Sequence, residues 1–205
     1  MNERLIELLT EALELLQAED SAQPEPASTA SVQVRRPIAW GAKVSPTFRD
    51  RVWWIADQLK LNPDDLMSCM AWESGESFRA DIKNAAGSGA TGLIQFMPAT
   101  ARGMGTTTAA LAKMTPEDQL TYVYKYFRPF AGRLNNLGDI YMAILWPKAV
   151  GKPDSYVLWD KGKMPTTFRQ NAGLDVNKDA RVTRAECLSK IMGKLSKGMQ
   201  PGYLG

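Results

Sequence analysis

The stretch "MAWESGESFRADIKNAAGSGATGLIQFMPATA" at residues 70–101 is the most informative part of the sequence. It places two glutamates, Glu73 and Glu76, directly ahead of a loop rich in glycine and alanine, and a second apolar run follows this loop. The chain of 205 residues contains no histidine. This excludes Ser-His-Asp and Cys-His nucleophilic catalysis, and it excludes zinc sites that use histidine. Hydrolytic chemistry would therefore rest mainly on carboxylates.

Helix signals recur on both sides of this stretch. Three prolines each follow a residue that caps helices, and each proline opens a segment with helical character. A further helix fits residues 137–146, whereas alternating strand patterns are scarce, so the sequence predicts a mostly α-helical domain. The three pairs of cap and proline are Ser45-Pro46, Asn62-Pro63 and Thr115-Pro116.

The two ends of the chain are expected to be additions to this domain. Leucines repeat at helical spacing over residues 3–17, which predicts an amphipathic helix, and a segment rich in Ser, Pro, Ala and Thr follows it as a linker. The helix is expected either to pair with another helix, in a dimer by self-association or in a larger assembly, or to dock on its own domain. The expected divisions are 1–20 for the N-terminal helix, 21–37 for the linker, 38–165 for the main domain and 166–205 for the C-terminal segment.

Charge, cysteine content and hydropathy limit the partners and the cellular location that can be expected for the protein. The net charge of +3 comes without a dense cluster of Lys and Arg, so charge alone does not argue for a nucleic-acid partner. Cys69 and Cys187 lie far apart without CxxC spacing, which predicts reduced, buried cysteines. No run approaches the ~18 apolar residues of a membrane span, and the N-terminus lacks the pattern of a signal peptide. Synthesis in a cytoplasm is therefore expected.

Glu73 falls at the end of the helix predicted from Pro63, on the same face as Leu66 and either Cys69 or Met70. That apolar face would remove water from the carboxyl group, and a helix C-terminus disfavours negative charge, so both effects would raise its pKa. A carboxylic acid that stays protonated near neutral pH can donate a proton to the leaving oxygen of a glycosidic bond. The alternative interpretation is a surface glutamate at a helix end.

The motifs that follow Glu73 resemble those of a known enzyme family. A serine comes directly after Glu73, Phe78 supplies an aromatic residue, and a Gly/Ala loop spans residues 84–91. The segments Gly-Leu-Ile-Gln and Met-Pro-Ala-Thr-Ala then follow within residues 92–101. Over residues 45–150 this order resembles the catalytic domain of soluble lytic transglycosylases, a lysozyme-like fold shared with goose-type lysozymes, and is most similar to the phage-encoded branch.

The resemblance implies a reaction in which one carboxylate acts twice. Glu73 would protonate the oxygen between N-acetylmuramic acid and N-acetylglucosamine, and would then take the proton from the muramoyl 6-hydroxyl. A 1,6-anhydro ring would form without consumption of water. The resemblance also implies a groove for peptidoglycan strands, in which Gln95 and the backbone around Gly92 hold the sugar. The residues expected to contact the glycan are Ser74, Phe78, Gly92, Leu93, Gln95, Tyr141 and Trp146.

The sequence departs from the family pattern in two places. Two more residues than usual separate Glu73 from Phe78, so Glu76 with the serine after it is a second candidate for the acid. The family's Ala-Tyr-Asn motif is absent, and "DIYMAILWPKAVG" at residues 139–151 stands in its region. These departures leave open a hydrolytic reaction that is ended by water, for which Asp81 and Glu76 are the available second carboxylates.

Aromatic residues could line such a groove. The chain has six tryptophans, and aromatic side chains with a polar tip suit a wet surface on which sugar rings stack. Packing in the core is the alternative for each of them. The groove candidates are Trp72, Trp146, Tyr156 and Trp159.

A second motif, "DVNKDARVTRAE" at residues 175–186, has the spacing of an EF-hand calcium loop. Oxygen ligands fall at positions 1, 3, 5, 9 and 12, position 7 offers a backbone carbonyl, and a helix follows. Position 6 is Ala180, where the turn favours glycine; a left-handed alanine costs roughly 1–2 kcal/mol, so weak affinity is expected. The expected calcium ligands are Asp175, Asn177, Asp179, Arg181, Thr183 and Glu186.

A single loop of this kind favours one role for calcium over another. Calcium sensors, and the dockerin modules that the loop also resembles, use paired loops, so a structural clamp on the last helix is expected. The alternative is a charged turn that caps a helix without metal.

These features predict a phage-type peptidoglycan lytic transglycosylase, which acts on the cell wall either as an endolysin or as an enzyme carried in the virion and tethered through its N-terminal helix. Three other classes stay open. A hydrolytic muramidase on the same fold would leave reducing-end products. A non-catalytic wall-binding or tail module would keep its function after Glu73→Gln. A calcium-responsive interaction protein would change conformation strongly with calcium and would not lyse walls.

Overall fold

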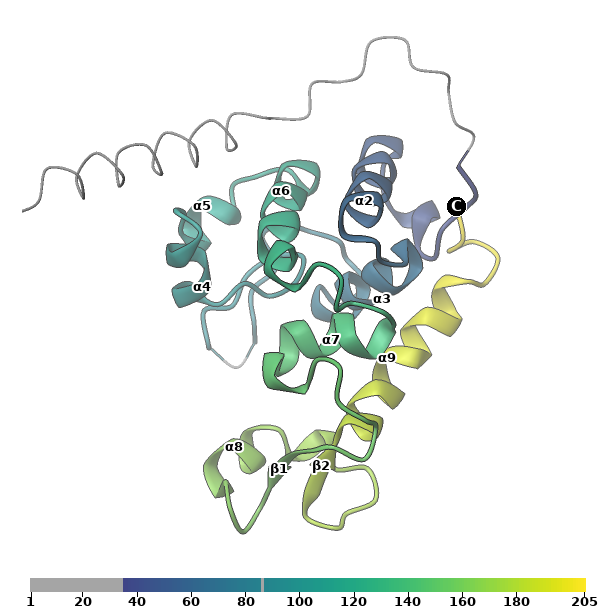
Figure 1. Cartoon of the computed structure of the whole chain (residues 1–205). Coiled ribbons are helices and arrows are strands. Elements are labelled where there is room, and N and C mark those ends of the chain that lie inside the picture. The colour runs from purple at the N-terminus through teal and green to yellow at the C-terminus, as the bar shows by residue number, and fades with distance from the viewer. Residues whose placement is uncertain (1–34, 86) are drawn as a thin grey trace, which may run out of the picture. The chain divides into compact units, whose positions relative to one another are not determined.

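The computed structural model describes residues 35–85 and 87–205 (Figure 1). The chain divides into two units, Met1–Arg36 and Pro37–Gly205. The amphipathic helix predicted for residues 3–17 and the linker residues 21–34 lie outside the described residues.

Helices dominate the unit formed by residues 37–205, which confirms the prediction of a mostly α-helical domain. Within the described residues, β1 (Val157–Asp160) and β2 (Arg181–Thr183) form an antiparallel pair. Short 3-10 helices are η1 (Gly41–Lys43), η2 (Arg128–Phe130), η3 (Pro147–Ala149) and η4 (Ala172–Leu174). The α-helices are α2 (Pro46–Leu59), α3 (Pro63–Glu73), α4 (Pro98–Gly103), α5 (Thr108–Leu111), α6 (Pro116–Phe127), α7 (Leu137–Leu145), α8 (Pro165–Gln170) and α9 (Arg184–Gly198).

The predicted caps begin the helices that they precede. The Ser45 hydroxyl accepts a hydrogen bond from the backbone N–H of Phe48 at 3.1 Å, and the Asn62 side chain accepts one from Asp64 at 3.0 Å. Each cap satisfies a backbone donor that the first turn of a helix leaves without a partner. The proline that follows each cap lacks the N–H that would otherwise be unpaired there.

α3 is the central helix of the unit. It packs against α2, α7 and α9, and every residue from Pro63 to Ala71 is buried (Figure 1). Its last two residues, Trp72 and Glu73, are partly exposed. The helix therefore runs through the core and brings Glu73 to the edge of the packed region.

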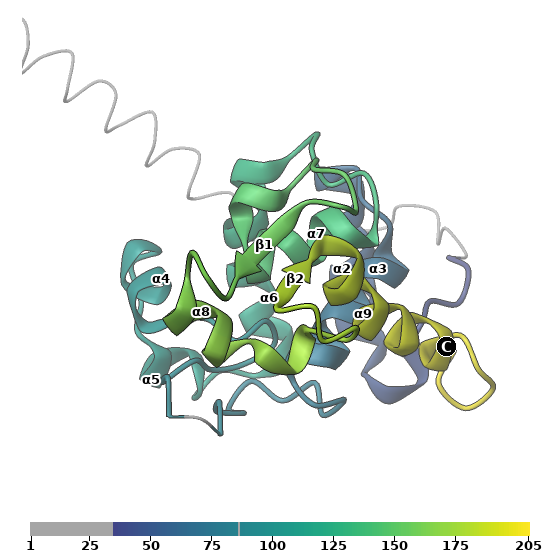
Figure 2. The same cartoon turned by 90° about the horizontal axis from the view of Figure 1, so that it is seen from below.

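β1, β2 and α8 form a smaller lobe beside the helical body (Figures 1 and 2). The register pairs Val157 with Thr183 and Trp159 with Val182, with an irregularity between Val157 and Trp159. Trp159 and Val182 are both buried and belong to the same apolar core as the helical body. The strand pair thus fixes the position from which α9 starts.

α9 leads from this lobe back along α3, and the C-terminus lies beside the first residues of the unit formed by residues 37–205. Ile38 and Gly205 exchange two backbone hydrogen bonds, of 2.9 and 3.2 Å, and the Trp40 ring packs edge-on against Tyr203. Residues 166–205, expected to be a C-terminal addition, therefore belong to the same compact unit as the rest of residues 37–205.

The structure bears on the predicted state of the two cysteines and on the expected lack of a membrane span. Cys69 and Cys187 are both buried, on α3 and α9 respectively, and neither forms a disulfide. Among residues 35–85 and 87–205, no helix combines the length and the apolar character needed to cross a membrane.

Candidate active site

Glu73 is the last residue of α3, and the turn that ends this helix fixes its position. Gly75 adopts a left-handed conformation, with φ 61°, and its N–H bonds to the carbonyl of Trp72. The next N–H, from Glu76, reaches back to the carbonyl of Ala71 at 2.7 Å. These two bonds form a Schellman turn, for which glycine is the favoured residue because it has no side chain to clash.

The carboxyl group of Glu73 lies in surroundings that favour its neutral form. Burial raises its pKa from 4.5 to about 8. Its charge in turn raises the pKa values of Cys69, one helical turn earlier, and of Tyr126 and Tyr141, which places these side chains near it. The rise of the Glu73 pKa through loss of water confirms that part of the sequence argument. At neutral pH the group is a protonated acid.

Tyr126 belongs to this site, although the sequence analysis did not select it. Its hydroxyl donates a hydrogen bond of 2.7 Å to the carbonyl of Ala143, and its ring packs edge-on against Phe96. Burial, and then the charge of Glu73, raise its pKa to about 12. α6 carries three tyrosines at alternate positions, and no local pattern distinguishes this one from Tyr122 and Tyr124.

Tyr141 was expected to contact the glycan, but only 2% of its surface is exposed. Its hydroxyl shares a hydrogen bond with the side chain of Trp72, and burial raises its pKa. Lys194 of α9 lies 6.0 Å from the centre of the Trp72 ring. The expected glycan contact of Tyr141 is therefore corrected to a buried contact that supports Trp72 near the end of α3. Trp72 is the more exposed residue of the two.

The turn from Ser74 to Phe78 is closed by its own side chains. The Ser74 hydroxyl donates to the carbonyl of Met70 at 2.7 Å and accepts from the N–H of Phe78 at 3.0 Å. Ser74 is 1% exposed and Phe78 is 3% exposed, and the Phe78 ring packs against Phe48 and Trp40. In this conformation their side chains cannot reach a ligand. The expected glycan contacts of these two residues are corrected to a role in shaping the turn.

Glu76 and Asp81, the two alternative carboxylates, are both ion-paired. Glu76 bonds to Lys194 and Lys197 of α9, and these hydrogen bonds hold its pKa below the usual range. Asp81 accepts two hydrogen bonds from Arg79, at 2.8 and 2.7 Å, which likewise lower its pKa. Neither group resembles a protonated acid at neutral pH. The geometry therefore favours Glu73 over Glu76 as the acid.

Gln119 holds the loop that contains the Gly-Leu-Ile-Gln segment. Its side chain is completely buried, accepts a hydrogen bond of 2.7 Å from the N–H of Leu93, and donates to the carbonyls of Ala80 and Leu111 at 3.0 Å. Gln119 is not among the site residues predicted from the sequence. The available signal was a glutamine four positions before Val123, on the apolar face of the predicted helix.

Gln95 and Leu93 face different surroundings. Gln95 is partly exposed, has a left-handed backbone with φ 53°, and donates from its side chain to the carbonyls of Gly92 and Ile82 at 3.1 and 3.3 Å. It remains a candidate for sugar contact. Leu93 is fully buried, so its expected side-chain contact with the glycan is corrected to core packing.

Gly92→Ala is expected to destabilise the protein by about 3 kcal/mol or more. Gly92 has φ 86°, and a Cβ atom there would overlap the buried side chain of Gln119. Gly87→Ala is the matched control, since its φ is 75° and the added Cβ meets no atom within 4 Å. Urea unfolding should give a loss of roughly 1 kcal/mol for the control. Equal losses for both variants would contradict the role assigned to Gln119.

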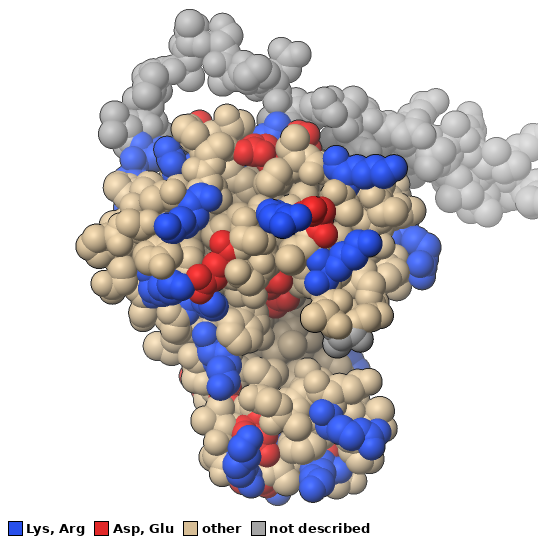
Figure 3. Space-filling model, turned by 180° about the vertical axis from the view of Figure 1, so that it is seen from behind, with Lys and Arg blue, Asp and Glu red and all other residues tan. Residues whose placement is uncertain are grey.

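Of the predicted aromatic groove residues, Trp146 and Trp159 pack edge-on at 5.7 Å. Trp159 is 2% exposed, so its expected contact with sugar is corrected to core packing of the smaller lobe. Trp146, Trp72 and Tyr156 are partly exposed and remain candidates. One face of the molecule is hollowed where the helical body narrows toward this lobe, and its Lys and Arg side chains are spread out rather than gathered (Figure 3).

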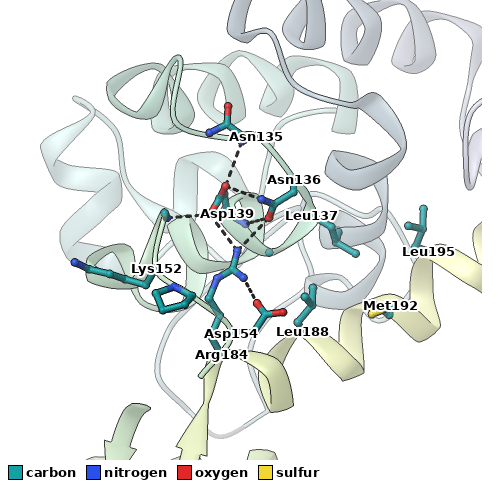
Figure 4. Close-up of a pocket in the computed structure, with 13 residues that line it drawn as sticks. Asn135, Asn136, Leu137, Asp139, Lys152, Asp154, Arg184, Leu188, Met192 and Leu195 are labelled. Atoms are coloured by element: carbon teal, nitrogen blue, oxygen red, sulfur yellow. Dashed lines mark hydrogen bonds and ion pairs between the residues drawn. The ribbon is translucent and has the colours of Figure 1, made fainter. Parts of the chain in front are cut away.

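A cavity of about 720 Å³ lies elsewhere, between the start of α7, residues 151–154 and α9. Arg184 enters it from the start of α9 and bonds to Asp139 at 3.0 Å, to Asn136 at 3.1 Å and to Asp154 (Figure 4). No residue expected to contact the glycan lines this cavity. Arg184 thus pairs with Asp139 and Asp154, and its bond to Asp139 connects α9 to α7.

The predicted calcium loop turns as its spacing requires. Ala180 is left-handed, with φ 69°, and its N–H bonds to the Asp175 carboxylate at 3.2 Å. Glu186 accepts hydrogen bonds from the backbone and hydroxyl of Thr183, and the two residues form a capping box at the start of α9. In the part of the chain that is described, no three Asp, Glu or Cys side chains converge as a metal site.

The comparisons with known proteins do not identify the chain. Its sequence matches no protein-family model and no curated protein. The case for a function therefore depends on the geometry and chemistry of the site around Glu73.

Proposed function

We propose that the protein is a peptidoglycan lytic transglycosylase with a lysozyme-like fold, which cleaves the β-1,4 bond between N-acetylmuramic acid and N-acetylglucosamine. One observation carries the proposal: Glu73 ends a buried helix, and burial raises its pKa to about 8. A carboxyl group of this kind is protonated at neutral pH, and the partly exposed side chain of Tyr126 lies near it. The resemblance of the flanking motifs supports the same assignment.

The chemistry needs one carboxyl group in two protonation states. Glu73 donates its proton to the bridging oxygen as the bond from this oxygen to C1 of the muramoyl sugar breaks. The resulting carboxylate then accepts the proton of the 6-hydroxyl while the 6-oxygen bonds to C1. The products are a 1,6-anhydromuramoyl end and a free 4-hydroxyl, and Glu73 is again protonated. A raised pKa suits both steps, because it keeps Glu73 protonated at neutral pH for the first step and makes its carboxylate a stronger base for the second.

A hydrolytic muramidase on the same fold is the second candidate. Glycosidases that use water employ two carboxylates that flank the bond. The two candidates for the second carboxylate, Glu76 and Asp81, are engaged by Lys194, Lys197 and Arg79. This pairing favours the internal 6-hydroxyl over water as the group that ends the reaction. A non-catalytic wall-binding module is the third candidate.

The proposed partner is the glycan strand of bacterial peptidoglycan. The hollow in Figure 3 offers a surface for a strand. The proposed sugar contacts are the partly exposed side chains of Gln95, Trp72 and Trp146. As a phage protein, the enzyme would act either as an endolysin on the host wall or from within the virion.

Release of soluble muropeptides from purified Gram-negative sacculi tests the proposal. The wild-type chain should solubilise sacculi in a time-dependent and concentration-dependent way, with calcium supplied. The matched control is Asp50→Asn, which changes an exposed carboxylate on α2 and should leave the rate unchanged. Binding to sacculi without any release would contradict the enzymatic proposal and leave the wall-binding module.

The cleavage rate should fall as the pH rises through about 8. The first step needs protonated Glu73, and above a pKa of about 8 the protonated fraction drops tenfold for each pH unit. The rate at pH 9 should therefore be roughly one tenth of the rate at pH 7. Initial rates of sacculus release in buffers of equal ionic strength measure this. A rate that increases from pH 7 to pH 9 would contradict the assigned acid.

A further inference from the structure

We propose that residues 175–186 bind one calcium ion, and that this ion fixes the start of α9. The strongest indication is the Asp175 side chain, which is 5% exposed. Its Oδ2 accepts the N–H of Ala180 at 3.2 Å, whereas its buried Oδ1 has no hydrogen-bond partner among the described residues. A buried carboxylate oxygen without a donor is costly, and a bound cation would remove that cost.

The loop around Asp175 has the backbone conformation that this use requires. Lys178 and Ala180 both have positive φ, of 64° and 69°, so the chain turns sharply twice within three residues. The Asn177 side chain accepts from the N–H of Asp179 at 3.0 Å, and Asp179 accepts from Arg181 at 2.9 Å. These bonds hold oxygen-bearing side chains at the first, third and fifth positions of a compact loop.

The donor set selects the ion. Carboxylate, amide, hydroxyl and backbone carbonyl oxygens are hard ligands, and the loop offers them without histidine or cysteine. Calcium accepts six to eight oxygens in flexible geometry, whereas magnesium demands a nearly ideal octahedron. An irregular loop closed by a glutamate at position 12 therefore favours calcium.

Glu186 must rearrange when the ion binds. Its carboxylate spans the loop and accepts hydrogen bonds from the N–H groups of Val176 and Asn177, at 2.9 and 3.3 Å, besides those from Thr183. The first and last positions of the loop are thus already joined. Because the acidic side chains do not yet converge, we infer that Glu186 exchanges some of these donors for the ion.

The consequence of binding reaches along α9. This helix begins at Arg184, which is held by Asp139 of α7, and its last turns carry Lys194 and Lys197, which hold Glu76 three residues after Glu73. An ion at the start of α9 would stabilise the helix whose lysines hold the turn that follows Glu73. The binding itself does not depend on the proposed enzymatic function.

Isothermal titration calorimetry of the full chain, freed of metal with a chelator and titrated with calcium chloride, tests the proposal. One saturable site is expected. Free calcium at about a hundred times the Kd should raise the melting temperature by roughly 5–10 °C. The same titration with magnesium chloride should give weaker binding.

Two variants locate the site. Asp179→Ala removes an exposed carboxylate, so the variant should still fold. Its calcium affinity should be at least tenfold lower than that of the wild type. Asp175→Asn should abolish binding, and Asp50→Asn, which changes an exposed side chain of α2, should titrate like the wild type. Absence of saturable heat up to about 10 mM calcium, weaker than extracellular modules bind, would overturn the proposal. A folded Asp179→Ala variant that binds calcium as tightly as the wild type would also overturn it.

Discussion

Replacing Glu73 with glutamine should lower the rate of sacculus cleavage by about a thousandfold or more. Glutamine keeps the shape of the side chain but can neither donate a proton to the bridging oxygen nor accept one from the 6-hydroxyl. Both steps assigned to this residue are lost together. Asp81→Asn is the matched comparison, and it should retain most of the activity because Asp81 is exposed and paired with Arg79.

The same substitution should make the protein more stable in alkaline solution. In the folded state the pKa of Glu73 is about 8, against 4.5 for an ordinary glutamate. Below pH 4.5 both states are protonated and the group has no effect on stability. As the pH rises toward 8, the unfolded state ionises first, so the wild type loses stability relative to Glu73→Gln. At pH 9 the difference should reach about 4–5 kcal/mol.

Urea unfolding at pH 5 and pH 9 measures this difference. Glu76→Gln should instead be less stable than the wild type at both pH values, because the two lysine partners of Glu76 lower its pKa. Glu76 therefore contributes stability above its ordinary pKa, and this is lost as the pH falls through its folded pKa. An inactive Glu73→Gln that is no more stable at pH 9 than the wild type would show that Glu73 is not a buried acid.

Arg184→Met should destabilise the protein by about 3 kcal/mol or more. The Arg184 and Asp139 side chains are only 6% and 3% exposed, and removal of the cation leaves a buried carboxylate with its hydrogen bonds but without its counter-charge. The N–H of Gly151 and the side chain of Asn136 still donate to Asp139, at 2.9 and 3.0 Å, which keeps the loss near the lower end for buried pairs.

Arg181→Met is the control for this prediction. Arg181 lies three residues earlier, and its pair with Asp160 is 60% exposed on the arginine side. Exposed pairs contribute little, so this variant should lie within about 0.5 kcal/mol of the wild type. Urea unfolding of both variants at pH 7 gives the comparison. Similar small losses would contradict the view that the Arg184 network joins α9 to α7.

The starts of the helices and the position of Glu73 could be predicted because their signals are local. Ser45 and Asn62 cap the residues that follow them, and the next proline fixes the first turn. The spacing from Leu66 to Glu73 sets which face of α3 carries the carboxylate. Burial of that face, and with it the raised pKa, follows from the apolar residues within one helix.

The supports of the site could not be predicted, because they join residues far apart in the sequence. Glu76 bonds to Lys194, which lies 118 positions later in the sequence. Arg184 bonds to Asp139, which lies 45 positions earlier. Propensity and periodicity carry no information about such pairs. The same limit explains the errors on Phe78 and Leu93, since an aromatic or aliphatic residue beside a glycine-rich loop can face either the groove or the core, and packing decides which.

Mass spectrometry of the fragments that the wild-type chain releases from purified sacculi tests the central claim most directly. The account predicts muropeptides that end in 1,6-anhydromuramic acid, and no such products from Glu73→Gln. Fragments heavier by one water, with reducing muramic acid ends, would contradict the proposed use of the 6-hydroxyl and would identify a hydrolase. Anhydro ends produced equally by Glu73→Gln would contradict the assignment of the acid.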